Sequence, residues 1–215
     1  MQNTQDKIWY ASYGSNILED RFLCYIKGGK PNGSSKEYTG CRDKTPPTEN
    51  EDFYICSELY FAKNSVNWEN GGVGFIRTIF KPQASTFGRI YLITKEQFID
   101  VAKQETSTEG ELEMDFNKAI KEGSYIFKQR SWYGNLIHLG EQKDYPIFTF
   151  TNEEDIQPFT KPSKNYIQTI IRGIKETHNF DDKTILEYLS DKGGIKNNYS
   201  DQELRNIINE CETRK

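Results

Sequence analysis

Histidine is almost missing from this chain: only His138 and His178 occur among its 215 residues. The four cysteines show no CxxC spacing and no paired histidines, so the sequence pattern of a zinc site is absent. A nucleophilic Ser15 would need a histidine as its base, and its surroundings do not match the Gly-x-Ser-x-Gly turn of many hydrolases. We therefore expect neither a metal site nor serine–histidine chemistry. His138 alternates with Ile137 and Leu139, which is typical of a surface or structural residue on a strand.

Long apolar runs and an excess of positive charge are also missing. No stretch approaches the ~20 apolar residues needed to cross a bilayer, and the N-terminus lacks the charged and then apolar pattern of a signal peptide. The formal net charge is -4, and basic residues occur in small groups. We therefore expect no membrane or nucleic-acid partner, and free thiols in a cytoplasmic protein. The sequence leaves the oligomeric state open.

Aromatic residues are what the chain has in quantity. Its hydrophobic fraction is only 35%, but 13 Tyr, 13 Phe and 3 Trp supply large areas for burial in a core. Apolar patterns predict strands at 53–62, 73–80, 87–94, 125–127, 133–139 and 145–150, and helices at 95–105, 109–121, 166–174, 184–189 and 200–211. We expect 73–80 and 87–94 to form an antiparallel pair. The predicted fold class is α+β: a curled, mixed, mainly antiparallel β-sheet or small barrel with flanking helices and a helical C-terminal tail.

The chain opens with an apolar, aromatic run that ends in Tyr13-Gly14-Ser15-Asn16. Gly14 permits a sharp turn, and Ser15 and Asn16 are good N-cap residues for a helix over 18–25. Such a junction points backbone N–H groups and the positive end of a helix dipole at one place, which favours carboxylates or carbonyl oxygens. Taken alone, a motif this short is more often a capped turn without a ligand.

A carboxylate on an apolar helix face is the second feature. In the predicted helix 95–105, the buried stripe is formed by Phe98, Val101 and Ala102. Glu105 extends this stripe, so we expect it to point inward. Burial of a carboxylate costs several kcal/mol and raises its pKa, which suits general acid–base catalysis. The alternative is a glutamate at a fraying helix end that reaches water or pairs with an arginine such as Arg77 or Arg89.

Five segments follow one another in an informative order: Tyr13-Gly14-Ser15-Asn16, Trp68-Glu69-Asn70-Gly71-Gly72-Val73 with Thr78-Ile79-Phe80, Gly88-Arg89-Ile90-Tyr91, Gln104-Glu105, and Pro162-Ser163-Lys164-Asn165-Tyr166. This set resembles the motifs of the γ-glutamylcyclotransferase-like family, from Tyr13 to about His178. The resemblance implies a family domain over 1–178, with insertions at about 28–50 and 106–123. A helical C-terminal extension over 179–215 would follow.

The resemblance also implies a reaction. The α-amine of a small γ-glutamyl amide attacks the γ-carbonyl of the same molecule and releases 5-oxoproline and an amine. Glu105 takes the place of the family's general acid/base, and the substrate-binding residues would be Tyr13, Gly14, Ser15, Asn16 and Tyr166. No metal or other cofactor is required.

Departures from the family pattern keep alternatives open. Thr106 follows Glu105 where the family often has glycine, and Glu109-Gly110 makes Glu109 a rival for the catalytic role. Phe148 stands where the family has a substrate-contacting tyrosine. Tyr166 either faces the substrate or packs at a helix start. The alternative function is a non-catalytic binding or regulatory protein that retains the cyclotransferase pocket.

Overall fold

The structure is a computed structural model that describes residues 7–31 and 36–211. Residues 32–35 of the predicted insertion and 212–215 of the predicted extension lie outside the described residues. The chain divides into two compact units. The first contains the residues up to Ser12, Leu23–Phe53 and Arg89–Glu154; the second contains Tyr13–Phe22, Tyr54–Gly88 and the residues from Asp155 onward. The predicted domain boundary after residue 178 stays a prediction.

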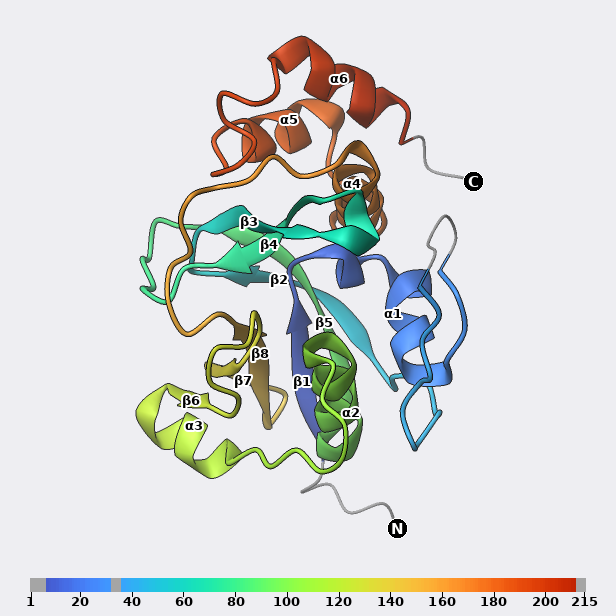
Figure 1. Ribbon diagram of the computed structural model, residues 1–215, viewed down its shortest axis with the longest axis vertical. Helices are drawn as coiled ribbons and strands as arrows, with labels where there is room; N and C mark the ends of the chain where they lie inside the picture. The colour runs from blue at the N-terminus through green and yellow to red at the C-terminus, as the bar shows by residue number, and fades with distance from the viewer. Residues whose placement is uncertain (1–6, 32–35, 212–215) are drawn as a thin grey trace. The chain divides into compact units, whose positions relative to one another are not determined.

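Most residues of a six-stranded sheet belong to the first unit, and its strand order is β2-β5-β1-β8-β7-β6 (Figure 1). Strand β1 is antiparallel to β5 and parallel to β8, whereas β6–β7 and β7–β8 are antiparallel pairs. Among the described residues the sheet ends at β2 and β6, so it is an open sheet rather than the small barrel. The strands are β1 (Lys7–Ser12), β2 (Asn50–Ile55), β5 (Thr86–Thr94), β6 (Ser124–Ile126), β7 (Asn135–Gln142) and β8 (Tyr145–Thr151).

Helix α2 (Lys95–Thr106) lies alongside β1 in Figure 1 and forms much of the core of this unit. A capping box starts the helix: Thr94 accepts from the Gln97 N–H, and the Gln97 side chain accepts from the Thr94 N–H. Phe98 is fully buried, and its ring lies 5.6 Å from Tyr10 and 6.3 Å from Phe148. The aromatic residues therefore fill the core as composition predicts. The unit also contains α3 (Phe116–Glu122) and the end of α1 (Glu19–Lys27).

The second unit combines a β-hairpin with helices. Strands β3 (Leu59–Ser65) and β4 (Gly71–Ile76) pair antiparallel, and the 3-10 helix η3 (Val66–Trp68) connects them. The helices are α4 (Lys164–His178), α5 (Asp182–Ser190) and α6 (Asp201–Asn209). A serine or aspartate side chain caps the N-terminus of each, which explains why local sequence signals located them. Fold class α+β with a helical C-terminal tail is confirmed.

Strand pairing and one helix differ from the prediction. The expected pair of 73–80 with 87–94 is wrong: β4 pairs with β3, and β5 pairs with β1. Residues 56–58 interrupt the strand predicted over 53–62, which leaves β3 free to form a hairpin with β4. The helix predicted over 109–121 is only the short α3, because Asp115 caps it by accepting the Lys118 N–H.

The segment before β2 is fastened to α2 rather than loose. Asp100 of α2, which is 6% exposed, accepts from the Arg42 backbone N–H at 2.9 Å and from its Nε at 3.1 Å. The Gln97 side chain donates to the Thr45 carbonyl at 2.8 Å, and the thiol of Cys41 lies 3.3 Å from the Tyr25 carbonyl. The described part of the predicted 28–50 insertion therefore covers one side of α2.

Candidate functional site

The N-terminal bend belongs to the second unit and begins directly after β1. Ser15–Ile17 form a 3-10 helix, η2, and α1 begins only at Glu19. The prediction that Ser15 and Asn16 cap an α-helix over 18–25 is therefore corrected: η2 has Gly14 as its N-cap and no side-chain cap. The N–H groups of Ile17 and Leu18 bond back to Gly14 and Ser15. The N–H groups of Gly14 and Ser15 have no hydrogen-bond partner among the described residues.

Tyr166 of α4 packs against this bend. A Cβ added to Gly14 would lie 3.1 Å from the Tyr166 hydroxyl, and this hydroxyl accepts the Gly74 N–H at 3.0 Å. Gly14 has a φ of -110°, so the bend needs glycine for close approach rather than for a left-handed backbone. Tyr166 is 3% exposed. Its ring therefore has a packing role, and a role toward substrate stays a prediction.

A buried cation that no sequence pattern predicts lies beside the bend. Arg21 is 6% exposed, its Nε donates to Ser15 Oγ at 2.8 Å, and its guanidinium lies 4.7 Å from the centroid of the Trp68 ring. The Trp68 ring in turn lies 4.7 Å from the ring of Tyr166. Arg21 follows Ser15 by six residues and Trp68 belongs to a quoted motif, but no local pattern links the two. Their contact could not be read from spacing alone.

These groups supply the bend with hydrogen-bond donors and a positive charge. Ser15 Oγ accepts from Arg21, so its own O–H is available to donate elsewhere. With the N–H groups of Gly14 and Ser15, the bend offers donors beside a fixed positive charge, as carboxylate and oxyanion sites do. Tyr13 and Asn16 are 5% and 4% exposed and form the buried flanks of this turn.

Glu105 belongs to the first unit, on the last turn of α2. Phe98, Val101 and Ala102 are fully buried, which confirms the predicted stripe, and Glu105 itself is half-buried. Its rival Glu109 lies after the helix end and is exposed. Of the two arginines considered as partners for Glu105, Arg77 forms ion pairs with Glu58 and Asp155.

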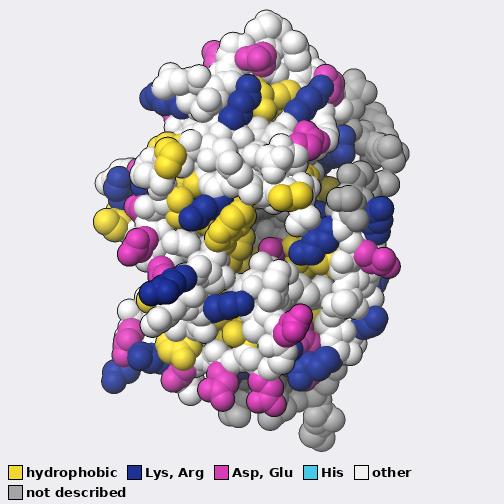
Figure 2. Space-filling model, in the orientation of Figure 1, with side chains coloured by type: hydrophobic (Ala, Val, Ile, Leu, Met, Phe, Trp, Pro, Cys, Tyr) yellow, Lys and Arg dark blue, Asp and Glu magenta, His cyan; other side chains and the backbone are white. Residues whose placement is uncertain are grey.

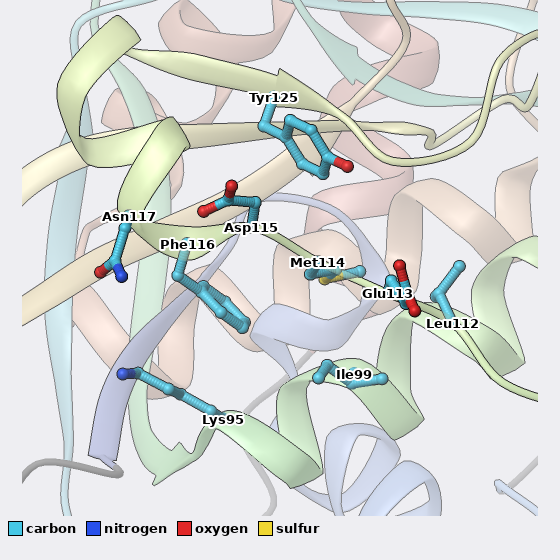
Figure 3. Close-up of a pocket in the computed structure, with 9 residues that line it drawn as sticks. All are labelled: Lys95, Ile99, Leu112, Glu113, Met114, Asp115, Phe116, Asn117 and Tyr125. Atoms are coloured by element: carbon cyan, nitrogen blue, oxygen red, sulfur yellow. The ribbon is translucent and has the colours of Figure 1, made fainter.

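A cavity of about 530 Å³ opens between α2 and the segment that leads into α3 (Figure 3). Phe116, Met114 and Ile99 provide its apolar wall, and the Lys95 ammonium lies 5.9 Å from the centroid of the Phe116 ring. None of the residues predicted for the site lines it. Most of its lining residues come from the predicted insertion over 106–123 and from α2. The remaining lining residues are Leu112, Glu113, Asp115, Asn117 and Tyr125.

The surface charges are mixed in sign. On the face drawn in Figure 2, Lys and Arg side chains are interspersed with Asp and Glu side chains. Within 7–31 and 36–211, no group of three or more His, Cys, Asp or Glu side chains is arranged to hold a metal ion. No helix in the described part of the chain is both long enough and apolar enough to span a membrane. All four cysteines are free thiols.

Comparison with known proteins gives one curated relative and several similar structures. No protein-family model matches the chain. Histone deacetylase 5 of Arabidopsis thaliana is 37% identical over 192 residues; these cover 79% of this chain and 28% of that relative's length. A solved structure of a γ-glutamyl cyclotransferase has a TM-score of 0.51 at 15% identity, over 95% of this chain and 99% of that one. An uncharacterized protein from Homo sapiens gives 0.51 at 16% identity with the same coverage. Identities this low show the fold alone.

Proposed function

This chain has the γ-glutamyl cyclotransferase fold, and from that fold we propose that it releases 5-oxoproline from a small γ-glutamyl amide. The α-amine nitrogen of the substrate attacks its own γ-carbonyl carbon. The amide bond to the leaving nitrogen then breaks, and a free amine or amino acid departs. Nucleophile and electrophile belong to one molecule, so the protein's main task is to hold a reactive conformer. The proposed reaction consumes no water and needs no metal or nucleotide as a reactant.

Glu105 is the proposed general acid/base. At neutral pH the α-amine is protonated and cannot attack, so a base must remove a proton. The leaving nitrogen needs a proton before it departs, and the same carboxyl group can return one. The half-buried position of Glu105 at the end of an apolar stripe supports this assignment over the exposed Glu109.

The bend is the proposed binding site for the charged part of the substrate. The observation that carries the proposal is the pair of N–H groups on Gly14 and Ser15, which have no partner within 7–31 and 36–211, beside the buried guanidinium of Arg21. Such donors bind a carboxylate or stabilise the oxyanion of the tetrahedral intermediate. Tyr13, Asn16 and Tyr166 would shape the surrounding surface. We place this chemistry in the cytoplasm, in keeping with four free thiols.

A substrate panel with two glutamine variants tests the proposal. The wild-type chain is incubated with γ-glutamyl amines and γ-glutamyl amino acids, and 5-oxoproline is quantified. We expect Glu105→Gln to lower kcat at least about 100-fold, the scale of lost general acid–base catalysis, while substrate binding is retained. Glu109→Gln is the matched control and should keep wild-type activity. Loss of activity in the Glu109 variant alone would move the catalytic role to that residue.

The second candidate function is binding without turnover. The match to 28% of a larger protein named a histone deacetylase favours it, because a segment of this kind can serve as a module beside another activity. Thr106 and Phe148, the departures from the family pattern, also favour it. Calorimetry with the same panel separates the two functions. Binding of a γ-glutamyl compound with no 5-oxoproline from any panel member supports the module and rejects the enzyme.

A further inference from the structure

The helix that carries Glu105 ends without glycine. Thr106 is the last residue of α2, and the C-cap Ser107 adopts the left-handed conformation with φ 48° and ψ 47°. Helices commonly end in this conformation, but glycine usually occupies it because a Cβ makes it unfavourable. The C-cap of α2 therefore carries backbone strain two residues after Glu105. The N–H groups of Ser107 and Thr108 both donate to the Lys103 carbonyl, and side chains add to this closure.

Side chains around Lys128 reinforce the end of α2. The Lys128 ammonium donates to the Thr106 carbonyl at 2.8 Å and to the Thr108 hydroxyl at 2.6 Å. Thr106 Oγ1 donates to the Ala102 carbonyl at 2.8 Å and lies 2.7 Å from Thr108 Oγ1. Two carbonyls of the helix end thus gain side-chain donors, and a positive charge lies at the negative end of the helix dipole.

Lys128 is itself held in place by the turn between β6 and β7. The N–H groups of Phe127 and Lys128 both donate to the Gly134 carbonyl, at 2.9 and 3.2 Å. A Cβ on Gly134 would overlap the Lys128 carbonyl oxygen, so only glycine permits this approach. These contacts hold the backbone of Lys128 in place, so its side chain extends to the end of α2 from a fixed position.

We propose that Lys128 is a positioning residue for Glu105, which it fixes by clamping the last turn of α2; this rests on the proposed function. Without the clamp, strain at Ser107 is relieved when the last turn unwinds, and helix ends fray readily. Glu105 then samples positions away from the substrate amine. A shift of about 1 Å can lower a rate about 10²-fold. The effect belongs in kcat, because Lys128 binds the helix end and not the substrate.

The test replaces Lys128 and leaves the rest of the full chain unchanged. Lys128→Met should lower kcat about 10- to 100-fold with KM within about twofold of wild type. Lys128→Arg keeps a cation and donors, and should recover most of the activity. Lys121→Met, an exposed lysine of α3, removes the same charge and should leave kcat unchanged. Thr108→Val removes one acceptor of the clamp, should give a smaller loss, and decides the question if Lys128→Met does not fold.

A double variant separates positioning from general stability. In a Glu105→Gln background, Lys128→Met should add no further loss, because the group that it positions is already gone. Wild-type kcat in both Lys128→Met and Thr108→Val, or a loss carried by KM alone, would overturn the clamp while the cyclotransferase stands. A wild-type chain that makes no 5-oxoproline would instead overturn the proposed function itself.

Discussion

At the scale of single residues, the Tyr166 hydroxyl links two backbone segments of the second unit. It accepts the buried Gly74 N–H at 3.0 Å, and it sets the space available at Gly14. Tyr166→Phe removes this hydroxyl as an acceptor of the Gly74 N–H. We expect the free energy of unfolding to fall by about 0.5–1.5 kcal/mol, the net contribution of one hydrogen bond. Urea denaturation measures it.

Tyr125→Phe is the matched control for this prediction. The structure gives the Tyr125 hydroxyl no hydrogen bond among the described residues, and its ring contacts the Lys118 ammonium instead. Loss of that hydroxyl should change stability by less than about 0.5 kcal/mol. Equal effects of the two substitutions would mean that the Tyr166–Gly74 hydrogen bond contributes nothing.

The sequence predicted single residues well where the reason was local, and poorly where it was not. Gly14 was singled out correctly as a special position, but its reason is the approach of Tyr166, 152 positions away in the chain. Arg21 was missed because its partners are a serine six residues before it and a tryptophan in another element. The stripe that contains Phe98 was predicted because its members share one helix face. The role of Glu105 stays a prediction.

At the scale of elements, α4 lies directly on the 3-10 helix that carries Ser15 and Asn16. A Cβ on Gly173 would lie 2.6 Å from the Leu18 nitrogen and 2.8 Å from the Ile17 carbonyl carbon. Alanine in place of glycine normally stabilises a helix interior by about 0.5–1 kcal/mol. Here we expect Gly173→Ala to destabilise by about 1–3 kcal/mol, because backbone must move apart.

The test is whether Gly173→Ala lowers or raises the stability of the protein. Thermal unfolding of Gly173→Ala should give a lower Tm than wild type, and the affinity for a γ-glutamyl compound should weaken, since the turn with Ser15 is displaced. Thr169→Ala changes a half-buried residue of α4 whose hydroxyl donates to the Asn165 carbonyl of the same helix; it is the control and should alter neither quantity much. A raised Tm for Gly173→Ala would show that α4 does not press on this turn.

Helices were predictable as elements, and strand partners were not. Capping side chains at Thr94, Ser163 and Ser200 mark helix starts within four residues of sequence. A strand pattern shows which residues alternate, but it contains no information about the neighbour. β1 pairs with β5, which lies about 80 residues later in the chain. The expected hairpin of 73–80 with 87–94 would have joined strands that are close in sequence. Tertiary packing therefore overrode the local preference for hairpins.

At the scale of the whole molecule, the strand and helix patterns along the chain predicted the α+β fold, but not the division into two units. Each unit is assembled from three separated segments of the chain, so no composition shift marks a boundary. Burial of titratable groups is likewise a property of the assembled molecule. Burial, with added repulsion from the Asp100 carboxylate, raises the pKa of the Cys41 thiol from 9.0 to about 12. No sequence pattern around Cys41 predicts this.

The raised pKa of Cys41 makes stability fall in alkaline solution. Above pH 9 the unfolded chain loses the thiol proton while the folded chain keeps it, so the folded state binds more protons. The free energy of unfolding then decreases by about 1.4 kcal/mol per pH unit from this group until the folded thiol also titrates. The free energy of unfolding, measured by urea denaturation, should therefore fall between pH 8 and pH 10 by about 1 kcal/mol less in Cys41→Ala than in wild type. Cys56→Ala, which removes an exposed thiol, should keep the wild-type loss. Equal losses in wild type and Cys41→Ala would mean that folding does not raise the pKa of the Cys41 thiol.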